Sequence, residues 1–216
     1  MKEKTIILLS GGLDSTTTLY YAKQKGYDCH ALIFNYGQRH AKEIKAAVEI
    51  ANLVQVPYQI LKIDFPWKGS ALTDSKIKVP SFKTFHKNIK SIPVTYVPGR
   101  NTIFLSFALS YAEAIKARFI FIGANAIDYS GYPDCRPGFF KAFRNLIKKG
   151  ARNKEIQIKT PLIKKTKPQI LKMALKLGVP VDKTWSCYKG GKKACGACDS
   201  CLLRNKAFNS DYHNRG

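Results

Sequence analysis

TIILLSGGLDSTTT, residues 5–18, is the stretch that decides the fold class of this chain. Its first part, residues 5–9, is a short continuous apolar run, which is typical of a strand buried on both faces of a parallel sheet. Residues 14–25 then show a helical pattern that ends at Gly26. A strand that runs through a glycine-rich turn into a helix places that turn at the carboxyl edge of the sheet, where α/β proteins bind ligands.

The turn has the composition of a phosphate-binding loop. Gly11 and Gly12 let the backbone approach an anion with no Cβ in the way. The N–H groups at the start of the helix point to the same place, and the helix dipole favours negative charge there. Ser10, Ser15 and Thr16 add hydroxyl donors. An ordinary glycine-rich turn is the alternative, and the polar residues on both sides of the glycines argue against it.

Asp14 fits beside phosphates only when a divalent cation bridges them, and Mg²⁺ usually accompanies nucleotide phosphates. The loop is not a Walker sequence, because no Gly-Lys-Ser/Thr follows, and its adjacent glycines differ from the dinucleotide fingerprint. We predict Asp14 and Ser15 as catalytic residues. The residues expected to bind the nucleotide phosphates are Leu8, Leu9, Ser10, Gly11, Gly12, Leu13, Asp14, Ser15, Thr16, Thr17 and Thr18.

Alternating strand and helix patterns predict one α/β domain over residues 1–180. The expected strands are 5–9, 29–34, 58–63, 118–123 and 155–159, and the expected helices are 14–25, 40–52, 101–116, 136–149 and 168–177. This order predicts a Rossmann-like parallel sheet with helices on both faces. We expect Asn101 to cap the helix 101–116, which is apolar on almost every side and should be buried. Residues 64–98 show no stable periodicity and are interpreted as a loop-rich insertion.

Composition limits the class of protein. The chain has 216 residues, 45% of them hydrophobic, which is enough for a sizeable core. No apolar run reaches membrane-spanning length, and the first is too short for a signal peptide. We therefore expect a soluble cytoplasmic protein.

The charge is strongly basic, with 37 Lys or Arg against 14 Asp or Glu and a formal net charge of +23. Residues 138–167 contain ten basic residues and one acid, Glu155, and residues 76–90 contain five lysines and no acid. RNA binding is one interpretation, because such patches attract phosphates. A general excess of lysine is the other, since no RNA-binding motif with interleaved aromatic residues is present. An anionic nucleotide substrate accounts for part of the bias in either case.

Four of the six cysteines fall within fifteen residues near the C-terminus, with the spacing C-x7-C-x2-C-x2-C. Four thiolates match a closed tetrahedral Zn²⁺ site, which would stabilise a segment at 181–216 that is too small for its own core. An iron–sulfur cluster is the main alternative, and unrelated buried thiols are the other. The predicted ligands are Cys187, Cys195, Cys198 and Cys201.

The SGGxDS loop resembles that of the ATP-pyrophosphatase (PP-loop) superfamily. The resemblance implies an adenine nucleotide alpha hydrolase-like fold and cleavage of ATP between its α and β phosphates. An oxygen of the substrate is adenylated, and a nucleophile such as ammonia or sulfide then displaces AMP. It also implies that adenine packs near Ile33 and Phe34.

Further stretches resemble one branch of that superfamily, the 7-cyano-7-deazaguanine synthase family, over nearly the whole chain. They are TYVPGRNT at 95–102, DYSGYPDCRP at 128–137, TWSCY at 184–188, ACGACDSC at 194–201 and Gln38-Arg39-His40. The resemblance implies that ATP and ammonia convert 7-carboxy-7-deazaguanine, through adenylated intermediates, into 7-cyano-7-deazaguanine, a queuosine precursor. It also implies a homodimer that does not require nucleic acid. Lys164-Lys165-Thr166-Lys167 is more basic than is usual in that family.

A planar, guanine-like substrate with a carboxylate needs an edge reader, a stacking surface and a cation. Asp134 is the predicted edge reader, because a carboxylate accepts from the N1–H and amino groups. Arg100 or Arg136 is the predicted clamp for carboxylate or phosphate, and Tyr132 or Tyr129 the predicted stacking surface. We predict Arg100, Asp134 and Arg136 as catalytic. Capping of neighbouring helices is the alternative role for Arg100 and Asp134.

Two other functions fit parts of the sequence. A PP-loop enzyme that modifies tRNA, by thiolation or by lysine transfer, suits the charge, but the chain has no recognisable appended RNA-binding domain. A nucleic-acid-binding protein with a zinc module leaves the phosphate loop unexplained.

Overall fold

The computed structural model describes residues 2–39, 41–80, 92–126 and 131–212, and within them the chain forms one parallel sheet of five strands. The order across the sheet is β3-β2-β1-β4-β5, so β1 is central. Leu8 pairs with Leu32 on one side of β1 and with Ile122 on the other. The strands are β1 (Lys4–Leu8), β2 (Asp28–Asn35), β3 (Tyr58–Lys62), β4 (Phe119–Ile122) and β5 (Gln157–Lys159).

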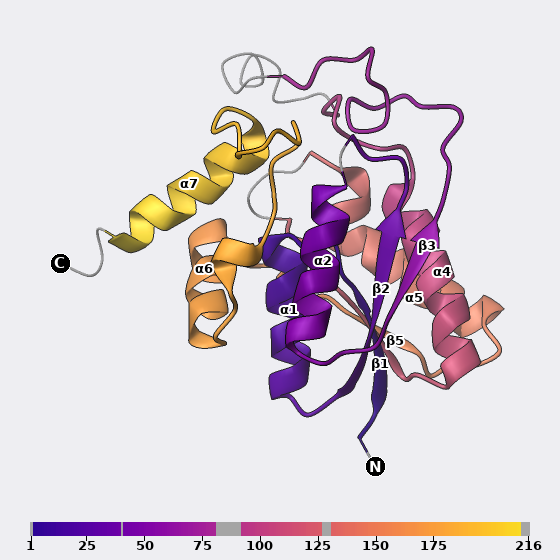
Figure 1. The fold of residues 1–216 in the computed structure, drawn as a ribbon. Coiled ribbons are helices and arrows are strands. Elements are labelled where there is room, and N and C mark those ends of the chain that lie inside the picture. Colours follow the sequence, from indigo (N-terminus) through magenta and orange to yellow (C-terminus); the bar gives the residue numbers. More distant parts are fainter. Residues whose placement is uncertain (1, 40, 81–91, 127–130, 213–216) are drawn as a thin grey trace.

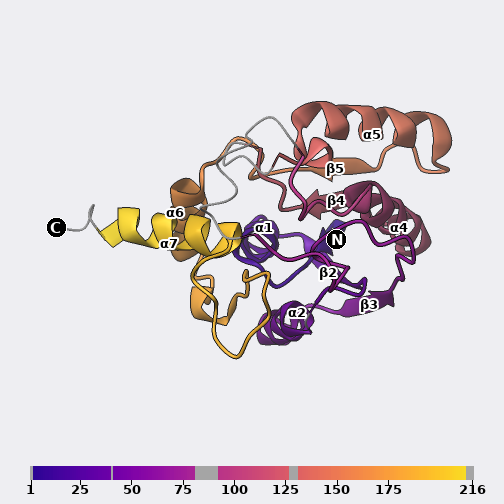
Figure 2. The same ribbon diagram turned by 90° about the horizontal axis from the view of Figure 1, so that it is seen from above.

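Helices cover both faces of the sheet, as Figures 1 and 2 show. On one face Ile7 packs with α1 (Leu13–Gln24) and α2 (Lys42–Leu53). On the other face Ile6 packs with α4 (Arg100–Ile115) and α5 (Pro137–Gly150). Because successive side chains of a strand point to opposite faces, a strand buried this way needs a continuous apolar run. The predicted Rossmann-like fold class is confirmed.

The C-terminal part packs beside α1. The helices α6 (Lys167–Lys176) and α7 (Asp199–Tyr212) share an apolar cluster with Leu13, formed by Ile170, Leu171 and Ala207. Helix α7 was not predicted, because its cysteine and polar residues hide the helical period. Two short 3-10 helices, η1 (Pro133–Cys135) and η2 (Val181–Lys183), complete the elements described.

Two expectations about α4 were wrong. Gly99, with a φ of +64°, occupies the N-cap position, and Asn101 lies inside the first turn. The helix is also not buried on every side, since Phe107 is 41% exposed. A helix on an outer layer contacts the sheet along one stripe only, here through Leu105 and Ala108.

Residues 64–80 and 92–98 contain turns and loops without helix or strand, as expected for the insertion. The helix expected at 40–52 begins at Lys42, and residue 40 lies outside the described residues. None of the helices in the described part of the chain is both long and apolar enough to cross a lipid bilayer.

Candidate active site and metal centre

The loop between β1 and α1 is held in shape by its own hydroxyl groups. The Ser10 N–H donates to Ser15 Oγ at 3.1 Å, and the two hydroxyl oxygens lie 3.0 Å apart. Ser15 Oγ donates to the carbonyl of Gly12 at 3.2 Å. The N–H groups in the first turn of a helix have no partner within the helix, so an anion held by this loop can accept from them.

Glycine at two positions lets other elements support the loop. Gly11 has a φ of +76°, and a Cβ there would lie 2.5 Å from the carbonyl oxygen of Glu43 on α2. Gly123 follows β4, and a Cβ there would lie 2.9 Å from backbone atoms of Asp14 and Ser15. Gly123 was predicted only as the end of the strand 118–123, without a role at the phosphate loop. A glycine at the end of a buried strand was the signal in the sequence for such a close contact.

Asp14 forms an ion pair with Lys167, the first residue of α6. Lys167 Nζ and Asp14 Oδ2 lie 2.5 Å apart, while Asp14 Oδ1 is buried without a hydrogen-bond partner among the described residues. A buried carboxylate oxygen of this kind is costly unless a cation or donor joins it. Lys167 was not among the residues predicted for the site. The unusually basic turn that contains it was the only signal.

Two of the other residues predicted to contact phosphate use their hydroxyl groups inside α1. The Thr17 hydroxyl donates to the carbonyl of Leu13 at 2.7 Å, and the Thr18 hydroxyl donates to that of Asp14 at 2.9 Å. Thr16 Oγ1 is buried and has no hydrogen-bond partner in the described part of the chain. The geometry favours the backbone and hydroxyls of residues 10–15 as the anion contacts.

The remaining predicted nucleotide contacts are core residues at the carboxyl ends of β1 and β2. Leu8, Leu9, Ile33 and Phe34 are all buried. The ring of Phe34 stacks on that of Phe104, with centroids 3.8 Å apart. Adenine binding at this place stays a prediction.

A polar cluster lies at the same edge of the sheet. Arg100 Nη1, from the start of α4, donates to the Tyr36 hydroxyl at 3.4 Å, and Tyr36 follows β2. The hydroxyls of Tyr132 and Thr95 lie 2.8 Å apart. Burial raises the pKa of Tyr36 to about 12, against the effect of the Arg100 charge, so this phenol stays protonated at neutral pH. Tyr188, next to Cys187 in the chain, interacts with Tyr132.

Glu43 lies between the loop and this cluster. Its carbonyl oxygen packs against Gly11, and its carboxyl group is near enough to Arg100 for the two charges to interact. Burial raises the pKa of Glu43 to about 7, and the Arg100 charge opposes this rise. The carboxyl group therefore exchanges its proton near neutral pH. Glu43 was not predicted as a site residue, although an acid in the first turn of the helix after the second strand was a visible signal.

Asp134 is 5% exposed, and it accepts hydrogen bonds from the first turn of α4. The Asn101 N–H donates to Asp134 Oδ2 at 3.1 Å, and Asn101 Nδ2 donates to the Asp134 carbonyl at 3.0 Å. The alternative that Asp134 caps the helix after it is wrong, because that helix has no side-chain cap. Asp134 and Arg100 are brought together, whereas Arg136 is exposed at the N-cap of α5. Tyr129 lies outside the described residues.

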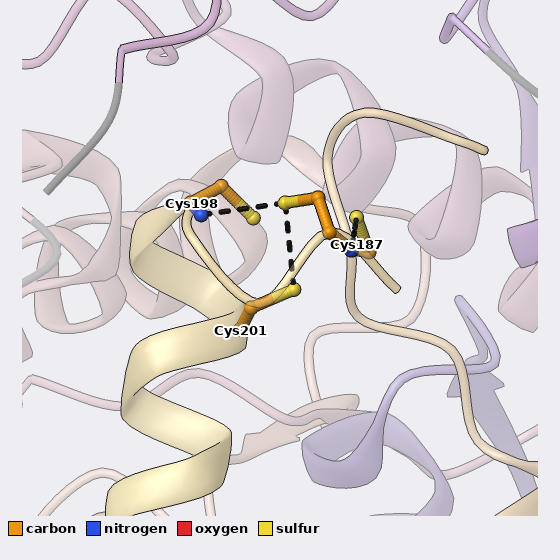
Figure 3. A group of neighbouring side chains, drawn as sticks. Cys187, Cys198 and Cys201 are labelled. Carbon is orange, nitrogen blue, oxygen red and sulfur yellow. Dashed lines mark hydrogen bonds between the residues drawn. The ribbon is translucent and has the colours of Figure 1, made fainter. Parts of the chain in front are cut away.

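The four clustered cysteines converge on one point. Figure 3 shows Cys198 and Cys201 at the start of α7 and Cys187 on a loop that faces them. All four sulfur atoms lie within 4.8 Å of one another, and those of Cys195 and Cys201 are 3.9 Å apart. A tetrahedron with Zn–S bonds of about 2.3 Å has edges of about 3.8 Å. The four thiols therefore fit a four-coordinate metal ion.

Backbone N–H groups prepare these sulfurs for ligation. Cys198 N donates to Cys195 Sγ, and Cys195 N donates to Cys187 Sγ, both at 3.4 Å. Desolvation raises the pKa of Cys195, but hydrogen bonds from the Ala197 and Cys198 N–H groups outweigh it and lower the pKa to about 6. A thiolate, the form that binds metal, is thus favoured at Cys195, whereas burial raises the pKa of the Cys198 and Cys201 thiols.

The cysteine segment is fastened to the phosphate loop. The Trp185 N–H donates to the Gly11 carbonyl at 2.9 Å. Lys42, at the start of α2, donates to the carbonyls of Gly191 and Lys192 at 2.5 and 2.7 Å and lies 4.3 Å from the centre of the Trp185 ring. The segment therefore packs against the phosphate loop and the start of α2.

Comparison with known proteins points to one family. The sequence matches the family described as Queuosine biosynthesis protein QueC over residues 4–212. A 7-cyano-7-deazaguanine synthase from Cyanothece sp. (strain PCC 7425 / ATCC 29141) is 54% identical over 95% of this chain and 94% of its own length. One from Thermoplasma acidophilum is 54% identical over 96% of this chain and 88% of its own length.

Solved structures share the fold at low identity. NMN synthetase from Francisella tularensis superposes with a TM-score of 0.51 and 16% identity, over 100% of this chain and 87% of that chain. A 4-thiouridine synthetase in complex with RNA and ATP gives a TM-score of 0.51 and 16% identity, over 96% of this chain and 54% of that chain. At such identities the likeness concerns the fold alone.

Proposed function

The chain belongs to the QueC family of queuosine biosynthesis proteins, and from this membership we propose that it is a ligase that makes 7-cyano-7-deazaguanine from 7-carboxy-7-deazaguanine, ammonia and ATP. Its curated relatives carry the name of that synthase at 51–54% identity. They support this function over tRNA modification, which would share the fold.

In the proposed reaction the substrate carboxylate attacks the α phosphate of ATP, which gives an acyl adenylate and pyrophosphate. Ammonia displaces AMP to give an amide. A second ATP then adenylates the amide oxygen with release of a second pyrophosphate, and that oxygen leaves as part of AMP while the nitrogen loses its protons and the nitrile forms. Residues 10–15 and Lys167 bind the leaving pyrophosphate through N–H groups, hydroxyls and one positive charge. Asp14 Oδ1, buried without a partner among the described residues, suits the Mg²⁺ that accompanies ATP.

Arg100 is our candidate for the group that orients the substrate carboxylate. It is held by Tyr36 and lies in the same cluster as Asp134 and Tyr132, which are the candidate edge reader and stacking surface. Arg136, exposed at the start of α5, is the weaker candidate. Glu43, whose pKa burial raises to about 7 beside Arg100, is our candidate for the group that accepts a proton from ammonium.

We propose structural Zn²⁺ at the four cysteines, because four ligands close the coordination shell and leave no open position. Bound there, it would fix the segment that carries Trp185 and Tyr188 against the site. We also propose cytoplasmic localisation, in keeping with the small-molecule substrates, and a homodimer. Exposed Ile60 and Phe107, at 46% and 41%, support a covered surface. Light scattering of the purified protein tests the dimer.

The deciding experiment incubates purified protein with ATP, ammonium and 7-carboxy-7-deazaguanine and follows nitrile and AMP by mass spectrometry. If folded, metal-loaded protein forms no nitrile, the proposed function is wrong. Metal analysis separates zinc from iron. Arg100→Lys and Arg136→Lys form a matched pair, and we expect a loss of at least about 100-fold in kcat/KM for the first alone. Equal losses of kcat/KM in both variants would show that Arg100 has no specific role in orienting the substrate carboxylate.

A further inference from the structure

A basic face lies at the edge of the sheet farthest from β3. Here α5 packs over the outer side of β5, as Figure 2 shows. The two elements border a cleft of about 580 Å³ that is lined by Arg144, Lys148, Lys154 and Lys159, with Glu155 as the only acid. The Arg144 guanidinium donates to the Ile158 carbonyl, at 3.2 Å from Nε and 2.9 Å from Nη2, so part of the strand edge is already paired.

Positive charge is denser on this face than in the N-terminal part of the chain. Residues 141–159, which cover most of α5 and all of β5, contain seven Lys or Arg and one acid, whereas residues 1–80 contain eleven Lys or Arg and seven acids. None of those seven forms an ion pair with another described residue. A general excess of lysine would not produce this asymmetry, so the face calls for an anionic partner.

The apolar side chains of α5 identify the kind of partner. Phe140 and Phe143 point into the core, and Leu146 is the one large hydrophobic residue of this helix that is more than 36% exposed. Without exposed aromatic rings the face offers no platform for stacking single-stranded bases. One exposed leucine is also much less than the continuous apolar face with which a helix inserts into a lipid surface. Phosphates presented at regular spacing on a double helix remain the best match.

We propose that the α5–β5 face binds the phosphodiester backbone of double-helical nucleic acid, independently of base sequence and away from the ATP site. The fourteen residues of α5 span about 21 Å, long enough to follow several phosphates. Five exposed cations are available on and after the helix: Lys141, Lys148, Lys149, Arg152 and Lys154. Five phosphate contacts predict a slope of log K against log salt of about −4.5. Affinity should therefore rise about 100-fold between 150 and 50 mM salt.

The test measures binding of the whole protein to a labelled 20-base-pair RNA hairpin and to a DNA duplex of equal length, by fluorescence anisotropy. The patch variant carries Lys148→Glu, Arg152→Glu and Lys154→Glu. The control carries Lys2→Glu, Lys45→Glu and Lys62→Glu, exposed lysines elsewhere with the same change of net charge. We expect the patch variant alone to lose at least about 30-fold in affinity at 50 mM salt, and its salt slope to fall by about 3. The RNA and DNA arms show which duplex is preferred.

Equal losses in both variants would overturn the proposal, because net charge alone would then explain binding. Absence of duplex binding by the parent protein would also overturn it, as would equal capture by vesicles of anionic phospholipid through the same residues. Nitrile formation should be unchanged in the patch variant. The binding result therefore stands or falls separately from the proposed synthase activity.

Discussion

Replacing Gly123 by alanine tests whether the end of β4 sets the position of the phosphate loop. The φ of this glycine lies outside the left-handed region, so alanine meets no backbone strain there. The added methyl group, however, would lie 2.9 Å from the carbonyl carbon and oxygen of Asp14 and from the amide nitrogen of Ser15. All three are backbone atoms, so the loop itself must move.

The size of the effect follows from those distances. Ordinary contact begins at 3.4 Å, so the loop must shift by about 0.5 Å. Overpacking of this kind costs about 1–3 kcal/mol, which lowers Tm by roughly 2–12 °C in a chain of this length. A loop displaced by half an ångström misaligns the phosphates, and we expect kcat/KM for ATP to fall by about 10- to 100-fold.

Gly138→Ala is the matched control, because a Cβ at that position meets nothing within 4 Å. It lies in α5, so alanine should raise stability slightly, by about 0.5–1 kcal/mol. Pyrophosphate release and thermal unfolding are measured for both variants. If Gly123→Ala keeps kcat/KM within twofold of the parent, β4 does not position the loop. If Gly138→Ala loses as much activity, the effect is not local.

Three further changes probe the site. Lys167→Met should lower kcat by about 10²-fold, with partial recovery in Lys167→Arg, because the site loses the charge that pairs with Asp14 beside the phosphate loop; a rise in KM with kcat unchanged would contradict this. Near pH 4.5, Glu43→Gln should have about the same free energy of unfolding as the parent protein. Its advantage over the parent should grow as the pH rises to about 7. The folded state holds that proton more tightly than the unfolded chain, and a pKa raised from 4.5 to about 7 bounds the gain at about 3 kcal/mol; a pH-independent difference in Tm would refute it. Cys195→Ser should reduce bound metal, measured by mass spectrometry, and weaken ATP binding; retained metal would show that this thiol is not a ligand.

Local patterns were sufficient to predict most of the fold and part of the candidate site. The buried run before Ser10 and the four cysteines each carry their signal within a few residues, and the structure has the strand and the sulfur cluster where they were expected. Helix and strand ends moved by one or two residues because caps depend on backbone conformation, as at Gly99.

Contacts between distant residues could not be read from the sequence. Lys167 meets Asp14 across 153 positions, and Trp185 meets Gly11 across a still longer separation. A lysine at a helix start or a tryptophan in a loop does not indicate which distant residue it contacts. The burial of α4 was overestimated for a related reason, because apolar composition does not say which elements remain to cover a helix.

The hydrogen bond between Trp185 and Gly11 has a consequence for how the protein is made. The loop that begins at Ser10 is synthesised first, but the backbone that braces it follows only after about 170 more residues, roughly 10–30 s later at common translation rates. During that interval the growing chain contains the glycines and hydroxyls of the loop but lacks the hydrogen bond from Trp185 to Gly11. We therefore expect the phosphate loop to reach its final position only after Trp185 has been synthesised.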